Sequence, residues 1–429
     1  MVRLSVSVGV VLVLAACGMV PSAGDGREKP SGAPPAWSTE LALEDRPVAA
    51  VAGRTLVVHD GSTLRGLSLD GRDLWRAEVP ADSLLGIAGE HIVVHAPGED
   101  GVRVIDVGTG EDRWRDSKAG DLAVFGDTVY SSRCAVGDTC RVTAREVSDG
   151  TVRWDVPATR QASVQSDAVG VPYPHVPPAA RRLALVTMPD GPSGDRWVTP
   201  VEAATGKPLS RRAEFHTWHA FIAGDVMVVT DHDSEPDCGV AMRGYDVKTG
   251  DQRWSTLAYS ARDTGGDCDK FLAPGESGMD AIGDGRTVVA VTRGGKPQLL
   301  DLRTGRTVWT AAEPGVPISG QGRFLLARDT ADRGPLRPYD TDSGSRSAVW
   351  KAPDPLWDDR LEVAVHREDA LVTAKLANRT ASGVIRYDLA TGDAQATYLG
   401  SYAGSGDGWL ATYQQDESGD TWRLHFHTY

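Results

Sequence analysis

The sequence predicts an all-β protein, a single β-propeller built from four-stranded antiparallel blades. Three observations support this fold: a repeated turn motif, regular spacing between its copies, and four short alternating apolar segments in each repeat. The 429 residues exceed the size of an ordinary domain, but a closed array of repeats reaches this length as one unit. The 48 glycines and 25 prolines agree with a fold rich in turns.

The clearest copy of the motif is YDVKTGDQRW, residues 245–254. We expect Asp246 to accept hydrogen bonds from turn amides and Gly250 to take a positive φ in a bulged hairpin. Trp254 is expected to dock between neighbouring sheets. Similar copies supply Asp106, Gly110, Trp114, Gly150, Trp154, Asp301, Gly305 and Trp309. Looser copies around Gly71, Gly206, Gly344 and Gly392 bring the visible units to eight.

The segments within a repeat are short and alternate between apolar and polar residues. The first repeat reads VAAVAG, TLVVHD, LRGLSL and DLWRAEV, and the second reads LLGIAG, HIVVHA, VRVIDV and DRWRDS. Each segment is separated from the next by Gly, Asp or Ser, which are typical of turns. Four strands per repeat is the number in a propeller blade.

The spacing of the motif predicts the number of blades and the closure of the ring. The eight signature glycines step by 39, 40, 56, 44, 55, 39 and 48 residues, which suits blades with some insertions. Residues 37–43 form a lone strand, and residues 409–415 and 421–429 resemble the second and third strands of a repeat without a fourth. We therefore expect the N-terminal strand to complete the last blade. Eight blades are predicted, with nine or seven as alternatives.

The N-terminus has the features of an export signal. Residues 1–16 contain one Arg followed by the apolar run LSVSVGVVLVLAA, which is too short to span a bilayer. The sequence Leu-Ala-Ala-Cys ending at Cys17 closely resembles a bacterial lipobox, which implies cleavage and lipidation of Cys17; an ordinary signal peptide is the alternative. Residues 17–36 then comprise the lipidated cysteine and a flexible tether, and residues 37–429 the propeller. The expected location is the outer face of the cytoplasmic membrane.

The four remaining cysteines are an even number in an exported chain, which favours disulfides. Cys134 and Cys140 flank a short loop between two strand-like segments, and Cys238 and Cys268 lie on either side of the Trp254 strand. We predict the pairs 134 with 140 and 238 with 268. Free or differently paired thiols are the alternative.

In an up-and-down meander, successive loops lie alternately on the two faces of the propeller. The signature turns share one face, whereas loops joining second to third strands and connections between blades lie on the other, which we call the connector face. The Cys134–Cys140 loop and residues 231–239 are expected there as second-to-third loops, and the insertions at 158–180 and 258–278 as connections between blades. Since loops carry function more often than strands, the connector face is the candidate binding surface.

The acidic side chains expected on this face are Asp231, Asp233, Glu235, Asp237, Asp267 and Asp269. Their oxygens suit Ca²⁺, but their spacing matches no EF-hand loop, and a solvated acidic loop is the preferred interpretation. His216, His219 and His232 suggest zinc less well than ordinary strand and rim histidines. His425 and His427 alternate along a terminal strand and are interpreted as structural. No metal site is predicted.

The motif copies at 245–254 and 300–309 resemble PQQ-type β-propeller repeats. Such repeats occur in quinoprotein dehydrogenases, in the outer-membrane assembly lipoprotein of Gram-negative bacteria and in exported actinobacterial lipoproteins. The resemblance covers residues 37–429. For the dehydrogenases it implies a quinone near the funnel, an adjacent-cysteine disulfide, a calcium site and a catalytic Asp. This sequence has no adjacent cysteines, and six of its 12 Trp follow signature glycines, so neither PQQ nor calcium is expected.

The expected function is that of a non-catalytic cell-surface lipoprotein whose propeller binds a protein or a cell-wall ligand. The formal charge of −14 disfavours nucleic acid or an anionic bilayer surface as the main partner. No catalytic residue is predicted, and we expect a monomer. The alternatives are a PQQ-dependent quinoprotein dehydrogenase and an envelope assembly scaffold like the outer-membrane assembly lipoprotein.

Overall fold

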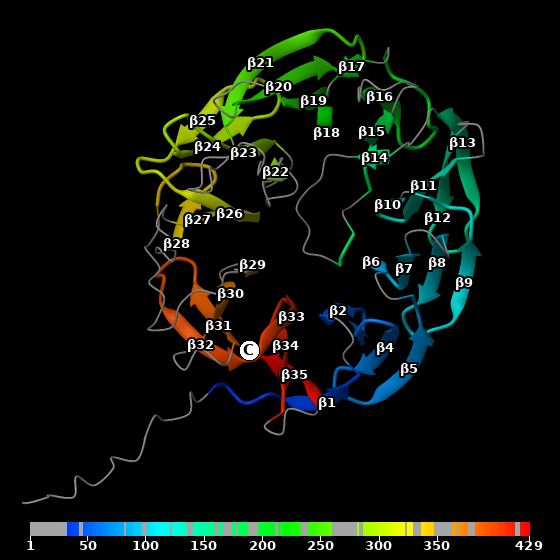
Figure 1. The fold of residues 1–429 in the computed structure, drawn as a ribbon, viewed down its shortest axis with the longest axis vertical. Coiled ribbons are helices and arrows are strands. Elements are labelled where there is room, and N and C mark those ends of the chain that lie inside the picture. Colours follow the sequence, from blue (N-terminus) through cyan, green and yellow to red (C-terminus); the bar gives the residue numbers. More distant parts are fainter. Residues whose placement is uncertain are drawn as a thin grey trace, which may run out of the picture. The chain divides into compact units, whose positions relative to one another are not determined.

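The computed structural model shows a chain of short antiparallel strands that follow one another around a ring (Figure 1). It describes residues 32–429 except 43–45, 81–82, 97–100, 121, 135–139, 159–162, 166–173, 177–178, 188–195, 211–212, 216, 233–238, 260–280, 283–285, 322–323, 329–335, 347–362, 367–368, 376–381 and 417–420. Residues 32–429 form one unit. The predicted signal segment and Cys17 lie outside the described residues.

The strands form consecutive meanders, each of which we call a blade. Blades 1 to 3 contain β2 (Val48–Ala52), β3 (Thr55–His59), β4 (Thr63–Ser68), β5 (Asp73–Glu78), β6 (Leu84–Ala88), β7 (His91–Ala96), β8 (Gly101–Asp106), β9 (Asp112–Asp116), β10 (Leu122–Phe125), β11 (Thr128–Cys134), β12 (Cys140–Glu146) and β13 (Val152–Ala158). Blades 4 to 6 contain β14 (Ser163–Gln165), β15 (Arg182–Thr187), β16 (Arg196–Glu202), β17 (Ala213–Phe215), β18 (Thr217–Ala223), β19 (Val226–His232), β20 (Gly239–Asp246), β21 (Gln252–Tyr259), β22 (Ala281–Ile282), β23 (Thr287–Val291), β24 (Pro297–Asp301) and β25 (Thr307–Thr310). Blade 7 contains β26 (Val316–Gln321), β27 (Phe324–Arg328) and β28 (Leu336–Asp340). Blade 8 contains β29 (Val363–His366), β30 (Asp369–Lys375), β31 (Ser382–Asp388) and β32 (Ala394–Leu399). The closing blade contains β33 (Ser401–Gly406), β34 (Trp409–Gln415), β35 (Trp422–Thr428) and β1 (Trp37–Leu41).

The described strands hydrogen-bond into eight sheets, the number of units predicted for the propeller. One of these sheets has eight strands and joins blades 5 and 6 through a single residue pair, Tyr259 with Val291. When each meander is counted separately, the described strands therefore make nine units, the alternative count that the sequence left open.

The N-terminal strand closes the ring, as predicted. β1 pairs antiparallel with β35, placing Trp37 opposite Phe426, and the closing blade has the strand order β33, β34, β35, β1. The rings of Trp37 and Phe426 stack at 5.1 Å. Because first and last strands share a blade, this end of the chain leaves no exposed blade edge.

Among the described residues, tryptophans join six pairs of consecutive blades in the way the motif predicts. The indole of Trp114 lies against Gly150 of the following blade and donates its Nε1–H to the carbonyl of Val147 at 2.7 Å. The same arrangement recurs in the pairs Trp37 with Gly71, Trp75 with Gly110, Trp154 with Gly206 and Trp309 with Gly344. The joints are buried: one apolar cluster, for example, contains Trp75 together with Leu85 and Ile92 of blade 2.

The signature turns have the predicted backbone geometry. All eight signature glycines have a positive φ, for example 73° at Gly110 and 78° at Gly250. Asp246 Oδ1 accepts hydrogen bonds from the amides of Lys248 and Thr249, and Asp106 and Asp301 do the same in their own turns. A bulge precedes six of these turns, as between Gly244 and Tyr245. These residues therefore build the turn.

One loop assignment from the sequence was wrong. β14 pairs with β15, so the insertion at 166–181 joins first and second strands of blade 4 instead of connecting two blades. First-to-second turns share a face with the signature turns, as shown by the bond from the Val107 amide to the Glu90 carbonyl. The three-residue β14 lies in a stretch without apolar alternation, which is why the sequence did not reveal it.

Candidate functional site

A cavity opens on the connector face between blades 1 and 2. Its volume is 690 Å³. Its lining residues come from the connection after β5, from β7 and β8, and from β9 and the residues just after it: Glu78, Val79, Pro80, Val94, Gly101, Arg103, Arg115 and Ser117. We call it the connector-face pocket.

Two arginines and one carboxylate determine the charge of this pocket. Arg103 donates to the Glu78 carbonyl at 2.5 Å and forms an ion pair with Asp112, and Arg115 binds the other oxygen of Asp112. Burial acts to raise the pKa of Asp112, but its hydrogen bonds to the two arginines outweigh burial and hold the pKa below its usual value. Asp112 thus stays ionised and fixes both guanidinium groups at the pocket wall.

Gly101 allows the pocket wall to form. Its φ is 62°, and a methyl group on its Cα would lie 2.1 Å from the carbonyl oxygen of Asp116. Only glycine combines this conformation with so close an approach between β8 and the end of β9.

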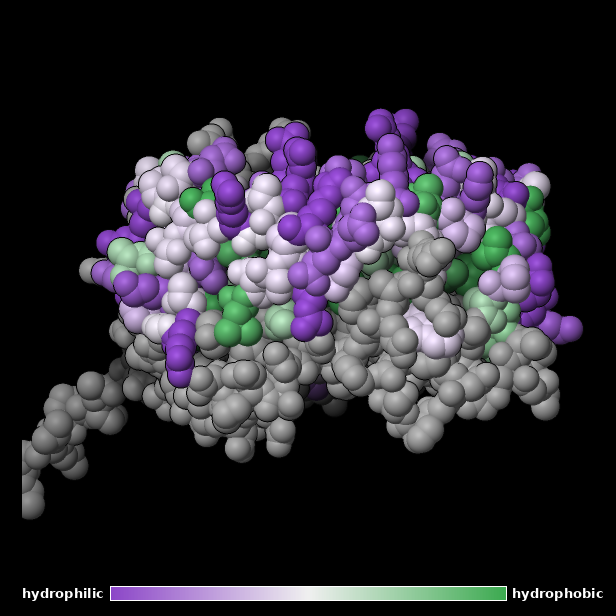
Figure 2. Space-filling view, turned by 90° about the horizontal axis from the view of Figure 1, so that it is seen from above, coloured by the Kyte–Doolittle hydropathy of each residue, from purple (hydrophilic) through white to green (hydrophobic). Residues whose placement is uncertain are grey.

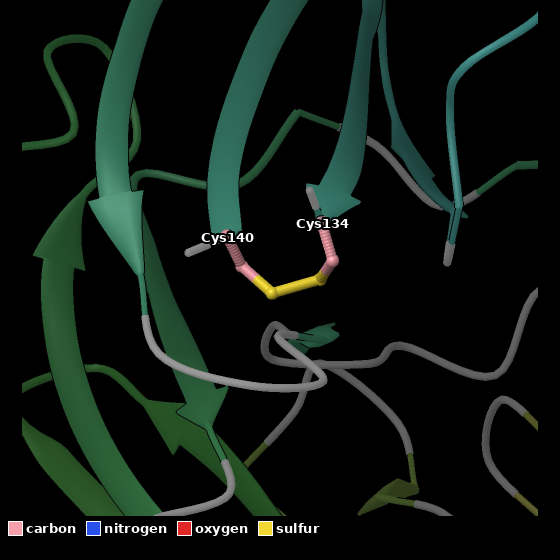
Figure 3. Close-up of a disulfide and its surroundings, with 2 residues drawn as sticks. All are labelled: Cys134 and Cys140. Carbon is pink, nitrogen blue, oxygen red and sulfur yellow. A yellow bond between two sulfur atoms is a disulfide. The ribbon is translucent and has the colours of Figure 1, made fainter. Parts of the chain in front are cut away.

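A disulfide braces the neighbouring loop on the same face (Figure 3). Cys134 ends β11 and Cys140 begins β12, and the two residues pair in register with their Cα atoms 4.0 Å apart. The predicted pair 134 with 140 is therefore confirmed. Closing this hairpin restricts a loop that joins second and third strands.

Asp116 connects the pocket to the disulfide hairpin. Arg133, the neighbour of Cys134, donates to both carboxylate oxygens of Asp116 at 2.6 Å, and Arg145 reaches the same carboxylate at 3.2 Å. The Asp116 side chain is 11% exposed and directly precedes Ser117 of the pocket. Pocket and hairpin therefore form one rigid surface across blades 2 and 3.

On the opposite face, the signature carboxylates are engaged within their own turns. Hydrogen bonding by the Thr249 amide, followed by that of Arg253, lowers the pKa of Asp246 to about 2. Arg253 also pairs with Asp225 at 2.8 Å, and Arg153 pairs with Asp127 at 2.9 Å. No role was predicted for these arginines, although Arg113, Arg153 and Arg253 each directly precede a motif Trp.

Most of the predicted acidic ligand set cannot be placed. Asp231 lies in β19, paired with Thr217 and Ala241, and its side chain is not described. The remaining predicted residues lie outside the described residues: Asp233, Glu235, Asp237, Cys238, Asp267, Cys268 and Asp269. Among the described residues, no group of three His, Cys, Asp or Glu is arranged to hold a metal ion.

The terminal-strand histidines have structural surroundings. His425 Nδ1 lies 2.7 Å from Ser38 Oγ, across the pairing of β35 with β1. His427 is 3% exposed, packs edge-on against Tyr398 at 4.9 Å, and lies 3.3 Å from Thr412 Oγ1. Burial lowers the pKa of His427 to about 4, so the ring is neutral at pH 7.

The outer wall is mainly hydrophilic. Figure 2, an edge-on view, shows hydrophilic side chains gathered along the upper edge of the described surface. The large apolar side chains exposed in the described part are scattered over several blades: Leu69, Leu74, Leu84, Val152, Leu257 and Val308. Scattered apolar residues are normal on a solvated surface. In the described part of the chain, no helix is long and apolar enough to cross a membrane.

Four of the described tryptophans are not available to stack on a quinone cofactor. Its flat ring needs aromatic faces, but the indoles of Trp75, Trp114, Trp154 and Trp309 are held in the blade joints by hydrogen bonds to the next blade. The described disulfide links cysteines six positions apart in a hairpin, whereas the dehydrogenase resemblance implies adjacent cysteines. We derive no chemistry through a quinone.

Several solved structures are similar to this chain. BamB from Moraxella catarrhalis is 13% identical with a TM-score of 0.43, covering 82% of this chain and 98% of that chain. Apo AztD from Citrobacter koseri is 13% identical with a TM-score of 0.46, covering 82% and 94%. A quinohemoprotein alcohol dehydrogenase from Pseudomonas putida HK5 is 12% identical with a TM-score of 0.42, covering 79% and 71%. No curated protein sequence matches the chain.

The family comparison covers most of the chain. The family model described as outer membrane protein assembly factor BamB matches residues 28–175 and 170–395. These ranges include every signature turn from Gly71 to Gly392, in agreement with the PQQ-type repeats that the sequence predicted. The chain therefore belongs to the β-propeller family of outer membrane protein assembly factor BamB.

Proposed function

We propose that this protein is an exported, lipid-anchored, non-catalytic scaffold that binds a protein or cell-envelope ligand through its connector face. The observation that carries the proposal is the bond from Arg133 to Asp116, which joins the connector-face pocket to the disulfide hairpin. A recess beside a hairpin closed by a disulfide suits recognition, because little conformational entropy is lost when a partner binds.

The placement of the motif residues supports a binding role. Asp, Gly and Trp of the described repeats form turns and blade joints, so the repeated residues hold the fold together. The connector face instead presents side chains that the turns and joints do not use, such as Arg115 and Ser117, both exposed at the pocket. Family membership is compatible with this role, since BamB is described as an assembly factor.

Export is supported by two features. The Cys134–Cys140 disulfide suits an oxidising compartment, and the N-terminal sequence has the length and apolar run of a signal segment. Lipidation of Cys17 would hold the propeller at the outer face of the cytoplasmic membrane as a monomer. PQQ and calcium are not part of this proposal; Trp75 and Trp154, for example, are held in blade joints.

The test compares two matched arginines. Arg115 and Arg76 occupy equivalent positions, each pairs with the Asp three residues before it, and their side chains are 58% and 61% exposed. Only Arg115 lines the pocket. We expect Arg115→Glu to lose the polypeptides or cell-wall fragments that copurify with the membrane-bound protein, whereas Arg76→Glu retains them. Equal retention by both variants would refute the proposal, provided that both unfold at the wild-type temperature.

A further inference from the structure

A segment of blade 4 lies along the inner edge of blade 2. The Ile87 amide donates to the Pro174 carbonyl at 2.8 Å, and the Val176 amide donates to the Ile87 carbonyl at 3.1 Å. Ile87 and His175 thereby form a parallel bridge. Since the other edge of β6 pairs with β7, Pro174–Val176 continues the blade 2 sheet as a short additional strand.

Two glycines make room for this segment. A methyl group on Gly86 would lie 3.0 Å from Val176 Cγ1, and one on Gly126 of blade 3 would lie 2.7 Å from Ala179 Cβ. Val176 packs against the apolar cluster that contains Val93 and Val129. The segment therefore occupies a shaped groove between blades 2 and 3, held by main-chain bonds and a small apolar side chain.

Pro174 and His175 complete the contacts of the segment. Pro174 is buried, and burial also lowers the pKa of His175. Burial also lowers the pKa of His366 in blade 8, with a minor contribution from the charge of His175. His366 in turn contacts Ser405 Oγ of the closing blade at 2.6 Å. Pro174 is thus buried, and Val176 packs against the apolar cluster, so the two outer residues of the segment are the ones whose side chains the groove encloses.

We propose that the inner edge of β6 is a binding site for an extended peptide, and that Pro174–Val176 occupies it as an internal ligand. Strand addition uses main-chain hydrogen bonds for affinity and pockets for alternate side chains for specificity, and the segment shows both. The favoured peptide has proline followed two positions later by a small β-branched residue. This site is separate from the connector-face pocket and does not depend on the function proposed for that pocket.

Pro174–Val176 belongs to the same chain as β6, so a free peptide must compete with it for the edge of β6. A segment linked to its own site has an effective concentration of about millimolar, so a free peptide of equal intrinsic affinity is excluded. Weakening the internal ligand without changing β6 should open the site. Val176→Asp does this, because a carboxylate at the Gly86 contact would be buried without a partner.

The experiment uses a fluorescent synthetic peptide with the sequence of residues 172–179, PYPHVPPA. We expect saturable binding to the full-length Val176→Asp protein and at least tenfold weaker binding to the wild type. Adding Gly86→Val to the Val176→Asp protein should abolish binding, since the new side chain fills the groove while suiting a strand. Absence of peptide binding to Val176→Asp, or binding unaffected by Gly86→Val, would overturn the proposal.

If Val176→Asp does not fold, a milder variant and a second measurement still test the proposal. Val176→Ala removes only two methyl groups and should admit the peptide at higher concentration. Amide hydrogen exchange reports the edge directly: Ile87 should exchange at least tenfold more slowly than Val51, its equivalent in blade 1, and Val176→Ala should reduce this difference. Equal exchange of Ile87 and Val51 in the wild type would show that the edge is unoccupied and contradict the proposal.

Discussion

The indole of Trp75 lies against the backbone of Gly110 in the next blade, so closely that a methyl group on Gly110 would be 2.6 Å from the ring. The same indole donates to the Val107 carbonyl at 2.8 Å. Repeats such as those of Trp75, Trp114 and Trp309 thus carry both halves of a joint: a glycine that receives the previous Trp and a Trp that docks on the next glycine. This relationship recurs at six joints among the described residues.

Gly110→Ala tests the joint. Both Gly110 and Gly89 have a positive φ, 73° and 60°, but only Gly110 has atoms within 4 Å of an added methyl group. We expect Gly89→Ala to cost about 1 kcal/mol in free energy of unfolding from backbone strain alone. Gly110→Ala should cost about 1–3 kcal/mol more, because it displaces Trp75. Chemical denaturation measures both, and equal costs would show that the contact is unimportant.

The tryptophan hydrogen bond can be separated from the packing of the ring. Trp309 donates to the Thr341 carbonyl at 2.9 Å, whereas Trp254 Nε1 is buried without a hydrogen-bond partner among the described residues. Trp309→Phe should therefore destabilise the protein by about 1 kcal/mol more than Trp254→Phe. The unfolding free energies of the two variants decide the matter, and a larger loss for Trp254→Phe would contradict the assignment.

The disulfide should stabilise the connector face by a modest amount. Replacing both Cys134 and Cys140 with Ser reopens a loop of six-residue separation, which the chain-entropy model values at about 2 kcal/mol. Reducing the wild type should produce the same loss of unfolding free energy. A double variant that is as stable as the oxidised protein would indicate that the bond does not restrain the unfolded chain.

His427 should make stability depend on pH. Burial lowers its folded-state pKa to about 4 from 6.5, so the unfolded chain binds a proton that the folded protein does not between these values. The contribution of His427 to the free energy of unfolding is complete above pH 6.5 and declines by ~3 kcal/mol as the pH falls to about 4. His427→Phe should remove this part of the decline relative to the wild type in denaturation at pH 7 and 4. An unchanged decline would show that His427 is not the group responsible.

The sequence predicted those parts of the fold that depend on local chemistry. Asp246, Gly250 and Trp254 act within ten residues of one another, so their pattern is visible in one repeat. Closure by Trp37 could also be predicted, because the last repeat visibly lacked a strand. The first strand of blade 4 was harder, since the short β14 has almost no apolar alternation.

The sites depend on contacts between blades, which no single repeat encodes. Arg103 reaches Glu78 of the preceding blade, and Pro174 reaches Ile87 two blades away. Neither pairing leaves a periodic signal in the sequence. The Cys134–Cys140 pair was predictable because both residues belong to one hairpin; the pairing of Cys238 with Cys268 stays a prediction that non-reducing peptide mapping can check.

The central claim is that the signature turns build the ring while the connector face binds the partner. The most direct test places a photo-reactive amino acid at Ser117, beside the pocket, or at Lys248, in a signature turn; both residues are exposed. Irradiation of intact cells should give a discrete crosslinked species from position 117 that is absent from position 248. A species that forms at position 248 and not at position 117 would place the partner on the opposite face and contradict this account.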